Sequence, residues 1–344
     1  MTAPTAPAAP APNSSRADGR RMQAVIQRRY GDADVLSVGE IDRPAVAPGE
    51  VLLQVRAAGL DRGTWHLMTG KPYPLRLAGF GVRAPKNPVP GLDVSGVVIE
   101  VGSDVTRFAP GDEVYGIGKG SFAEFAAARE DKLALKPAAL TFEQAAALPV
   151  SGMTAYAGLA DVGKLQPGQR VLVVGASGGV GTYAVQIAKA LGAHVTGVAS
   201  TGKLDLVRSI GADRVIDYTR EDFAAGGTPY DLILDVGGNS SLRRLRRALT
   251  PRGTLVIAGG ENGGRWLGGA DRQLRALALS PFVRQRLTTF VSKEHFSGLE
   301  RLTALVDDGQ LVPAIERTLP LSGVAEAMRH LEAGRTRGKL VIVP

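Results

Sequence analysis

Hydrophobic and polar positions alternate in short runs along the first part of the chain, from residue 22 to about residue 150. The runs MQAVIQ, VLLQVRAA, VSGVVIEVG, DEVYGI and SFAEFAA are separated by turn residues, including Pro-Gly pairs at 48–49, 90–91 and 110–111. In the run 51–58, Val51, Leu53, Val55 and Ala57 share one face, while Gln54 and Arg56 lie on the other, as in a strand. Short strands with regular turns are typical of an antiparallel barrel or sandwich, so we predict a mainly β domain here.

The pattern changes after a predicted helix at 141–148. The apolar strand RVLVVG is followed by a helix with a buried stripe and by a second strand, HVTGVAS. Strands and helices go on alternating through RVIDY, YDLILDVGG, GTLVIAGG and LTTFVS, which predicts a doubly wound parallel sheet, a Rossmann fold. We expect the last strand, KLVIVP, to return to the first domain. The predicted division is 21–149 with 309–344 in the mainly β domain, and 150–308 in the Rossmann domain.

Composition excludes several classes of protein. A length of 344 residues favours two domains, and 44% hydrophobic with 22% charged residues is an ordinary globular balance. The chain has no cysteine and four scattered histidines, so we expect no disulfide, no thiolate chemistry and no metal site. The Ala- and Pro-rich residues 1–20 lack the features of a signal peptide, and we interpret them as a disordered leader. Glycines interrupt the longest uncharged stretch, 171–188, so we expect no membrane span and a cytoplasmic location.

The net charge of +8 is concentrated in one segment. Residues 243–286 contain ten arginines against two acids. Such a segment could bind an anionic ligand or RNA, but arginine is abundant along the whole chain, so we do not expect a nucleic-acid partner. The part from 261 to 284 has no assigned role; its Gly263, Gly264, Arg265 and Trp266 could line the substrate cleft, cover it or reach a second subunit.

The run VLVVGASGGVG at 171–181 carries the strongest functional signal. Ala176, Gly178 and Gly181 form a variant of the dinucleotide fingerprint between a buried strand and a helix. Gly178 and Gly179 let the backbone approach a pyrophosphate, Gly181 permits close packing of the helix, and the helix N-terminus supplies N–H donors. We therefore predict a dinucleotide site that includes Ser177.

Two other motifs overlap this region. Residues 175–179 also fit the nucleophile elbow G-x-S-x-G, in which Ser177 would need Asp235 and His295 as partners. That interpretation leaves the first 150 residues without a role, so we do not favour it. The run 158–164 begins like a P-loop but continues with Leu165, which cannot ligate magnesium.

The residues after the second strand of the unit bear on the choice of cofactor. An NAD site places an acid there on the ribose diol, but this chain has Ser200, Thr201 and Lys203. Two hydroxyls and a positive charge favour a 2′-phosphate, so we predict NADPH.

The same glycine-rich run resembles a known family. Gly168-Gln169, Leu172, the residues 176–181, Gln186 and Lys189 are similar to the signature of the quinone oxidoreductase/zeta-crystallin branch of the medium-chain dehydrogenases/reductases. PVPGLDVSGVVIEVGSDVTRFAPGDEVYG at 88–116 and the final GKLVIV also resemble this superfamily. The resemblance covers residue 22 to the end. It implies a GroES-like catalytic domain wrapped around the Rossmann domain, an active site between them, and a homodimer or homotetramer.

The resemblance also implies an activity and site residues. The chain has Asp61 and Leu92-Asp93 where zinc-dependent relatives have Cys and His-Glu, which implies zinc-independent hydride transfer to a quinone or an α,β-unsaturated carbonyl. A biosynthetic enoyl or enone reductase, and an NADPH-binding sensor with little turnover, remain as alternatives. Lys203 and Tyr218 are implied contacts of the 2′-phosphate, and Thr154 lies near the nicotinamide in this reading.

The catalytic candidates depart from the pattern of the zinc-free relatives. Asp61 stands where they have Asn, and His66 stands where they have Tyr. After hydride transfer the proton could come from His66, from Tyr73 or from solvent. We complete the predicted cofactor-binding set with four further positions: Val180, Val236, Gly237 and Gly259.

Overall fold

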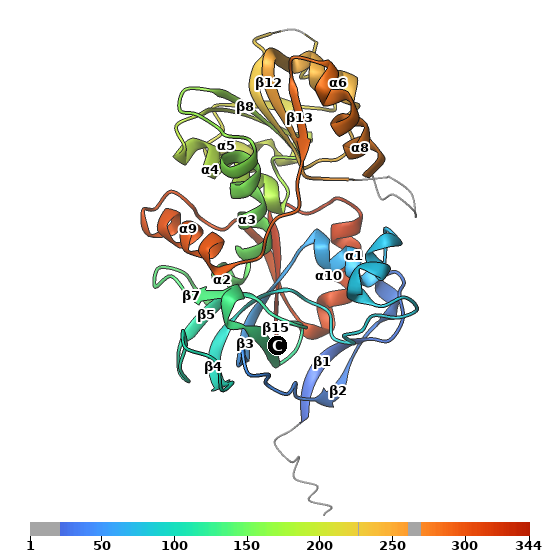
Figure 1. Cartoon of the computed structure of the whole chain (residues 1–344), viewed down its shortest axis with the longest axis vertical. Coiled ribbons are helices and arrows are strands. Elements are labelled where there is room, and N and C mark those ends of the chain that lie inside the picture. The colour runs from blue at the N-terminus through green and yellow to red at the C-terminus, as the bar shows by residue number, and fades with distance from the viewer. Residues whose placement is uncertain (1–20, 226, 261–269) are drawn as a thin grey trace, which may run out of the picture.

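The computed structural model describes residues 21–225, 227–260 and 270–344 (Figure 1). The predicted leader 1–20 and the residues 263–266 lie outside this part of the chain. The described structure contains a six-stranded parallel sheet, a seven-stranded sheet and a two-stranded ribbon. Figure 1 shows the parallel sheet and its helices in the upper part of the view and the mainly β part below them.

The parallel sheet has six strands in the order β10-β9-β8-β11-β12-β13. Every neighbouring pair in it is parallel. In order of sequence this is 3-2-1-4-5-6, the order of doubly wound sheets that bind dinucleotides. The prediction of such a sheet is confirmed. Its strands are β8 (Arg170–Val174), β9 (His194–Ala199), β10 (Arg214–Asp217), β11 (Tyr230–Asp235), β12 (Leu249–Ile257) and β13 (Arg286–Thr289).

Helices cover both faces of this sheet. Val171 and Val173 of β8 belong to the buried cluster that contains Tyr183 of α4, whereas Leu172 of the same strand packs in the cluster of Leu245 of α6. Burial on both faces explains why the strands are apolar without alternation. The helices on the sheet are α4 (Gly179–Ala190), α5 (Leu204–Ser209), α6 (Leu242–Ala248) and α8 (Ala270–Leu279). Helix α3 (Pro149–Tyr156) packs on α4, and α9 (Phe296–Asp307) packs on α3 and β7.

The mainly β part is built on a seven-stranded sheet and a two-stranded ribbon. The sheet has the order β14-β15-β3-β4-β5-β7, with β6 paired to β3, and the ribbon joins β1 to β2. The expected face of 51–58 is buried in the core of this sheet. The strands are β1 (Arg21–Gln27), β2 (Leu36–Asp42), β3 (Glu50–Leu60), β4 (Asp93–Val101), β5 (Glu113–Ile117), β6 (Phe125–Arg129), β7 (Leu133–Leu135), β14 (Ile315–Pro320) and β15 (Lys339–Val343).

The last strand returns to the first part of the chain, as predicted. β15 pairs antiparallel with β3, so that Leu340 faces Leu60 and Ile342 faces Ala58. The helices of this part are α1 (Arg62–Thr69), α2 (Phe142–Ala146) and α10 (Val324–Glu332). Short 3₁₀ or π turns lie at Ala33–Val35, Arg76–Phe80, Glu130–Lys132, Ala157–Val162, Thr201–Lys203, Ser280–Phe282 and Leu321–Gly323.

Candidate active site

A cleft of about 770 Å³ lies between the parallel sheet and the mainly β part. One wall consists of the carboxyl ends of β8, β9, β11 and β12 with the start of α4. The other wall consists of the junction of β3 and α1 and of the segment 331–340 that leads into β15. In open α/β sheets ligands bind outside the carboxyl ends of the strands, at the point where the strand order reverses, so this cleft is the candidate site.

The glycine-rich turn forms the middle of the first wall. A Cβ on Gly181 would lie 2.0 Å from the carbonyl oxygen of Gly175, so the close approach of helix and turn requires glycine there. A Cβ on Gly178 would meet no atom closer than 3.6 Å. The open space at Gly178, at the N-terminal end of α4, is a cradle of the kind that accepts a pyrophosphate. The residues present therefore fit a dinucleotide.

Most of the predicted residues line this cleft. The exceptions are Ala176, Thr201 and Tyr73. Ala176 is buried, and its N–H donates to the carbonyl of Val198. The residues that do line the cleft are Asp61, His66, Thr154, Ser177, Gly178, Gly179, Val180, Gly181, Ser200, Lys203, Tyr218, Val236, Gly237 and Gly259.

Thr201 points toward the neighbouring strand. Its hydroxyl donates to Oδ2 of Asp217 at 2.5 Å. The register of β9 and β10 sets Asp217 opposite Ala199, which brings this carboxylate beside the turn that follows β9. The hydroxyl of Thr201 therefore already has a protein acceptor.

Lys203 crosses the cleft. Its Nζ donates to the carbonyl oxygens of Gly334 at 2.7 Å and Thr336 at 2.8 Å, in the segment before β15. Burial lowers the pKa of Lys203, while Glu316 opposes this change and Arg337 adds to it. The ammonium group has three donors, so two carbonyl contacts leave its charge and one donor for a ligand.

Asp61 and His66 begin the opposite wall. Asp61 caps α1, with Oδ1 accepting from the Thr64 N–H at 2.8 Å and Oδ2 accepting from its hydroxyl at 3.3 Å. The Nδ1 atom of His66 lies 2.8 Å from the carbonyl oxygen of Lys71. Because a carbonyl only accepts, this contact places a hydrogen on Nδ1. Thr154, on α3, donates its hydroxyl to Val150 O at 2.7 Å.

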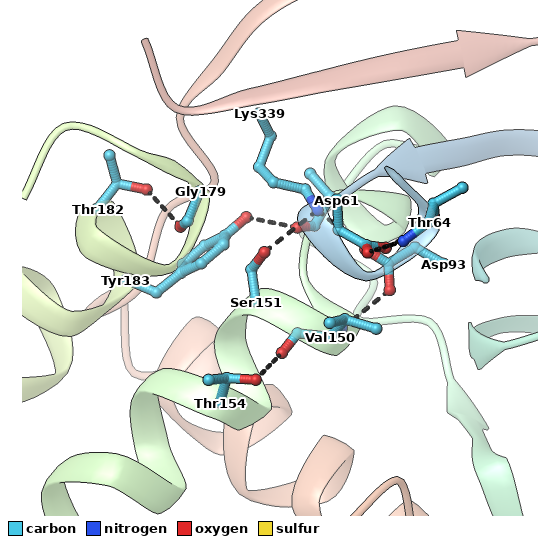
Figure 2. Close-up of polar contacts among 11 residues, drawn as sticks. Asp61, Thr64, Asp93, Val150, Ser151, Thr154, Gly179, Thr182, Tyr183 and Lys339 are labelled. Atoms are coloured by element: carbon cyan, nitrogen blue, oxygen red, sulfur yellow. Dashed lines mark hydrogen bonds and ion pairs between the residues drawn. The ribbon is translucent and has the colours of Figure 1, made fainter. Parts of the chain in front are cut away.

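The floor of the cleft contains a buried ion pair that the sequence analysis did not predict. Lys339 donates to Oδ2 of Asp93 at 2.9 Å and to the hydroxyl of Ser151 at 3.3 Å (Figure 2). Oδ1 of Asp93 accepts from the N–H of Val150 at 2.9 Å. Burial raises the pKa of Asp93 to about 7, although Lys339 lowers it; nearby Asp61 adds to the rise. The available signal was a charged residue at the start of each of two strands that are otherwise mainly apolar.

Two features are absent from the described residues. They contain no group of three or more His, Asp or Glu side chains arranged to hold a metal ion. In the same part of the chain, no helix combines the length and the apolar character needed to cross a bilayer.

Comparison with known proteins identifies the family. Residues 47–138 match the profile described as "Alcohol dehydrogenase GroES-like domain", and residues 210–342 match "Zinc-binding dehydrogenase". The human "NAD(P)H oxidoreductase RTN4IP1, mitochondrial" is 38% identical, over 93% of this chain and 89% of the relative. The chain belongs to the medium-chain dehydrogenases/reductases, in their quinone oxidoreductase branch. As a member of this branch it is an NAD(P)H-dependent oxidoreductase, with a GroES-like domain and a Rossmann domain.

Further relatives and solved structures agree with this family. The "Quinone-oxidoreductase QR1, chloroplastic" of Triphysaria versicolor is 31% identical over 95% of this chain and 99% of the relative. The "NADPH-dependent alkenal/one oxidoreductase, chloroplastic" of Arabidopsis thaliana is 33% identical, over 94% and 80%. The quinone oxidoreductase of Coxiella burnetii superimposes with a TM-score of 0.81 at 30% identity, covering 94% of this chain and 99% of that one. A mycobacterial protein solved with NADPH has a TM-score of 0.80 at 27% identity, covering 94% and 100%.

The comparison corrects the predicted location. The sequence predicted a cytoplasmic protein, but the human relative is named mitochondrial and those of Triphysaria and Arabidopsis are named chloroplastic. These names contradict a cytoplasmic location, so the prediction was wrong. It rested on the lack of a secretory signal and of an apolar span, and neither feature distinguishes the cytoplasm from the inside of an organelle.

Proposed function

We propose that this oxidoreductase transfers a hydride from NADPH to a quinone or to an α,β-unsaturated carbonyl, without a metal ion. The arrangement of one cleft carries the proposal: the glycine turn lies in one wall, and Asp61 and His66 lie in the other. The bound nicotinamide supplies the hydride. The residues of the chain bind and orient the two reactants and exclude water from the space between the walls.

Two side chains support a metal-independent reaction. Asp61 uses both carboxylate oxygens to cap α1, and Leu92 carries no ligand atom. A quinone or enone spreads the negative charge that develops after hydride transfer over its conjugated system. A simple aldehyde lacks this delocalisation and needs a Lewis acid or a strong donor at its oxygen. The side chains of this cleft therefore suit the conjugated acceptors.

Lys203 supports NADPH over NADH. It lies with Ser200 and Tyr218 on the cleft, just beyond the end of β9, where an NAD site has an acid. We expect Lys203→Met to weaken binding of 2′,5′-ADP at least tenfold, about 1.4 kcal/mol, and to leave binding of 5′-AMP unchanged. Lys189→Met is the matched control, because Lys189 pairs with Asp213 away from the cleft. Equal losses for the two nucleotides would argue against a 2′-phosphate contact.

The reaction is tested by NADPH oxidation with purified, chelator-treated protein. A quinone, an enone and an aldehyde serve as separate acceptors, and NADH is run in parallel. We expect turnover of quinone or enone with NADPH that survives chelation, and little turnover of the aldehyde. A strong preference for the enone would favour the alternative function, a biosynthetic enoyl or enone reductase. Turnover that disappears with the chelator and returns with zinc would overturn the proposal, and tight NADPH binding without reduction of any acceptor would favour a sensor.

We also propose the organisation of the chain. Residues 21–149 and 309–344 form the GroES-like domain and residues 150–308 form the Rossmann domain. The pairing of β15 with β3 supports the inclusion of the C-terminal segment in the first of these. We propose a homodimer or homotetramer, which light scattering after size-exclusion chromatography tests directly; a monomeric mass at assay concentration would contradict it.

A further inference from the structure

Arg272, which belongs to the arginine-rich segment 243–286, contacts three acceptors near the cleft. It lies in the first turn of α8, and its side chain is only 12% exposed. Nη1 lies 2.5 Å from Oδ2 of Asp235 and donates to the carbonyl of Ser240 at 2.8 Å. Nη2 donates to the carbonyl of Gly259 at 2.9 Å. One guanidinium thus joins the end of β11, the loop after it and the loop after β12.

The two loops held in this way form part of the cleft. Ser240 and Gly259 both line it, whereas Arg272 does not. Oδ1 of Asp235 accepts from the N–H of Gly238, within the first loop, at 3.2 Å. A Cβ on Gly259 would lie 2.4 Å from the carbonyl oxygen of Val236, so the loops are packed closely against each other. Arg272 therefore fixes the lining from outside the cleft.

The position of these loops in the sheet indicates which part of a dinucleotide they meet. A sheet of this order consists of two mononucleotide-binding halves on either side of the reversal point. The half made of β8, β9 and β10 carries Ser200 and Lys203, which face the adenosine ribose in the proposed function. The half that begins with β11 and β12 is left for the nicotinamide. The loops held by Arg272 belong to this second half.

We infer that Arg272 is a positioning residue for the nicotinamide half of the cofactor site. The inference rests on the proposed function, because it takes NADPH as the cofactor. The planar fork of arginine presents donors in fixed directions and so reaches three acceptors at once. Lysine at this position would keep the charge but not the fork. The acceptors are a fully buried carboxylate and two backbone carbonyls of half-buried residues, so a lost donor leaves the buried carboxylate without its partner.

The test compares Arg272→Met and Arg272→Lys with Arg275→Met. Arg275 lies on the same helix, but its side chain is 73% exposed and pairs with Asp271. Calorimetry gives the affinities for NADPH and for 2′,5′-ADP, which lacks the nicotinamide half. We expect Arg272→Met to weaken NADPH binding about tenfold or more, with 2′,5′-ADP changed less than about twofold and Arg275→Met like the wild type. Arg272→Lys should fall between Arg272→Met and the wild type.

A measurement without cofactor gives a second readout. Hydrogen exchange of the ligand-free protein should speed up in segments 236–240 and 258–260 of Arg272→Met, and stay unchanged in α4. If Arg272→Met does not fold, Arg272→Lys and Asp235→Asn are measured in the same way.

Two results would overturn the inference. One is a folded Arg272→Met protein with wild-type NADPH affinity and wild-type exchange. The other is an equal loss of affinity for NADPH and 2′,5′-ADP, since this would indicate a general structural role. A wild-type protein that binds neither ligand would instead count against the proposed cofactor, and the exchange data would still decide whether Arg272 orders the loops.

Discussion

The Nζ atom of Lys339 lies 2.9 Å from Oδ2 of Asp93, although 246 residues separate the two in the sequence. Both side chains are almost completely buried. The pair joins the start of β15 to the start of β4, and the hydroxyl of Ser151 on α3 also accepts from Lys339. A Cβ on Gly179 would lie 3.0 Å from Cδ of Lys339, so the glycine turn also packs against this pair. The floor of the cleft is therefore held by a contact among all these segments.

Removing one member of the pair should destabilise the protein strongly. A buried charge that loses its partner typically costs about 3–5 kcal/mol, whereas replacing both members costs much less. We expect Lys339→Met to lower the urea midpoint markedly, because it leaves the buried Asp93 without its cation, and the added change Asp93→Asn to restore much of that loss. Urea unfolding of the four proteins measures this coupling. Additive losses would show that the two side chains do not depend on each other.

The raised pKa of Asp93 predicts a particular pH dependence. Burial raises this pKa to about 7 against an ordinary value of 3.8, so the folded state binds the proton more tightly than the unfolded state. The stability that protonated Asp93 contributes to the folded state is complete below the pKa of the unfolded state. It is lost as the pH rises through about 7. Urea unfolding between about pH 5 and about pH 8 should show the wild type losing stability relative to Asp93→Asn, by at most about 1.4 kcal/mol per pH unit. Parallel profiles for the two proteins would contradict the shift.

Two glycines of the turn should respond differently to alanine. At Gly181 the added Cβ would meet the oxygen of Gly175 at 2.0 Å and Cα of Ala176 at 2.7 Å, and both are backbone atoms. We expect Gly181→Ala to destabilise the ligand-free protein by about 1–3 kcal/mol. Gly178→Ala should leave thermal stability unchanged and weaken NADPH binding, because its Cβ enters the space proposed for the pyrophosphate. Equal effects on stability would contradict this distinction.

We expect substitutions of the two candidate proton donors, His66 and Tyr73, to have different effects on kcat. His66 lines the cleft, whereas Tyr73 does not and has the guanidinium of Arg76 over its ring, 4.7 Å from the centroid. We expect His66→Asn to lower kcat about 100-fold or more, and Tyr73→Phe to leave it unchanged. Asparagine is chosen because its amide can still donate to the carbonyl of Lys71, as Nδ1 does now. Steady-state kinetics with a quinone and with an enone check this, and a reversed order of the two variants would make Tyr73 the donor.

Local patterns were sufficient to predict the strands and the glycine turn, because each depends on neighbouring residues. The return of β15 to β3 joins distant residues, and the resemblance of GKLVIV to the closing strand of the family supported that prediction. The remaining parts of the site depend on tertiary contacts. Lys339 and Asp93 meet only when β15 has joined the sheet, and Arg272 finds its acceptors on two separate loops. Thr201 was expected at the cofactor, but the register of β9 and β10 gives its hydroxyl the carboxylate of Asp217. No spacing in the sequence encodes these contacts.

The return of β15 also has a consequence for synthesis on the ribosome. Translation runs from the N-terminus, and domains generally fold as units while the chain emerges. All six strands of the parallel sheet, β8 to β13, precede β15 and form one continuous stretch. This sheet can therefore assemble while β3 still lacks β15, its last neighbour in the mainly β sheet. The parallel sheet can thus be complete before Lys339 is made, and Lys339 then joins the start of β15 to the start of β4.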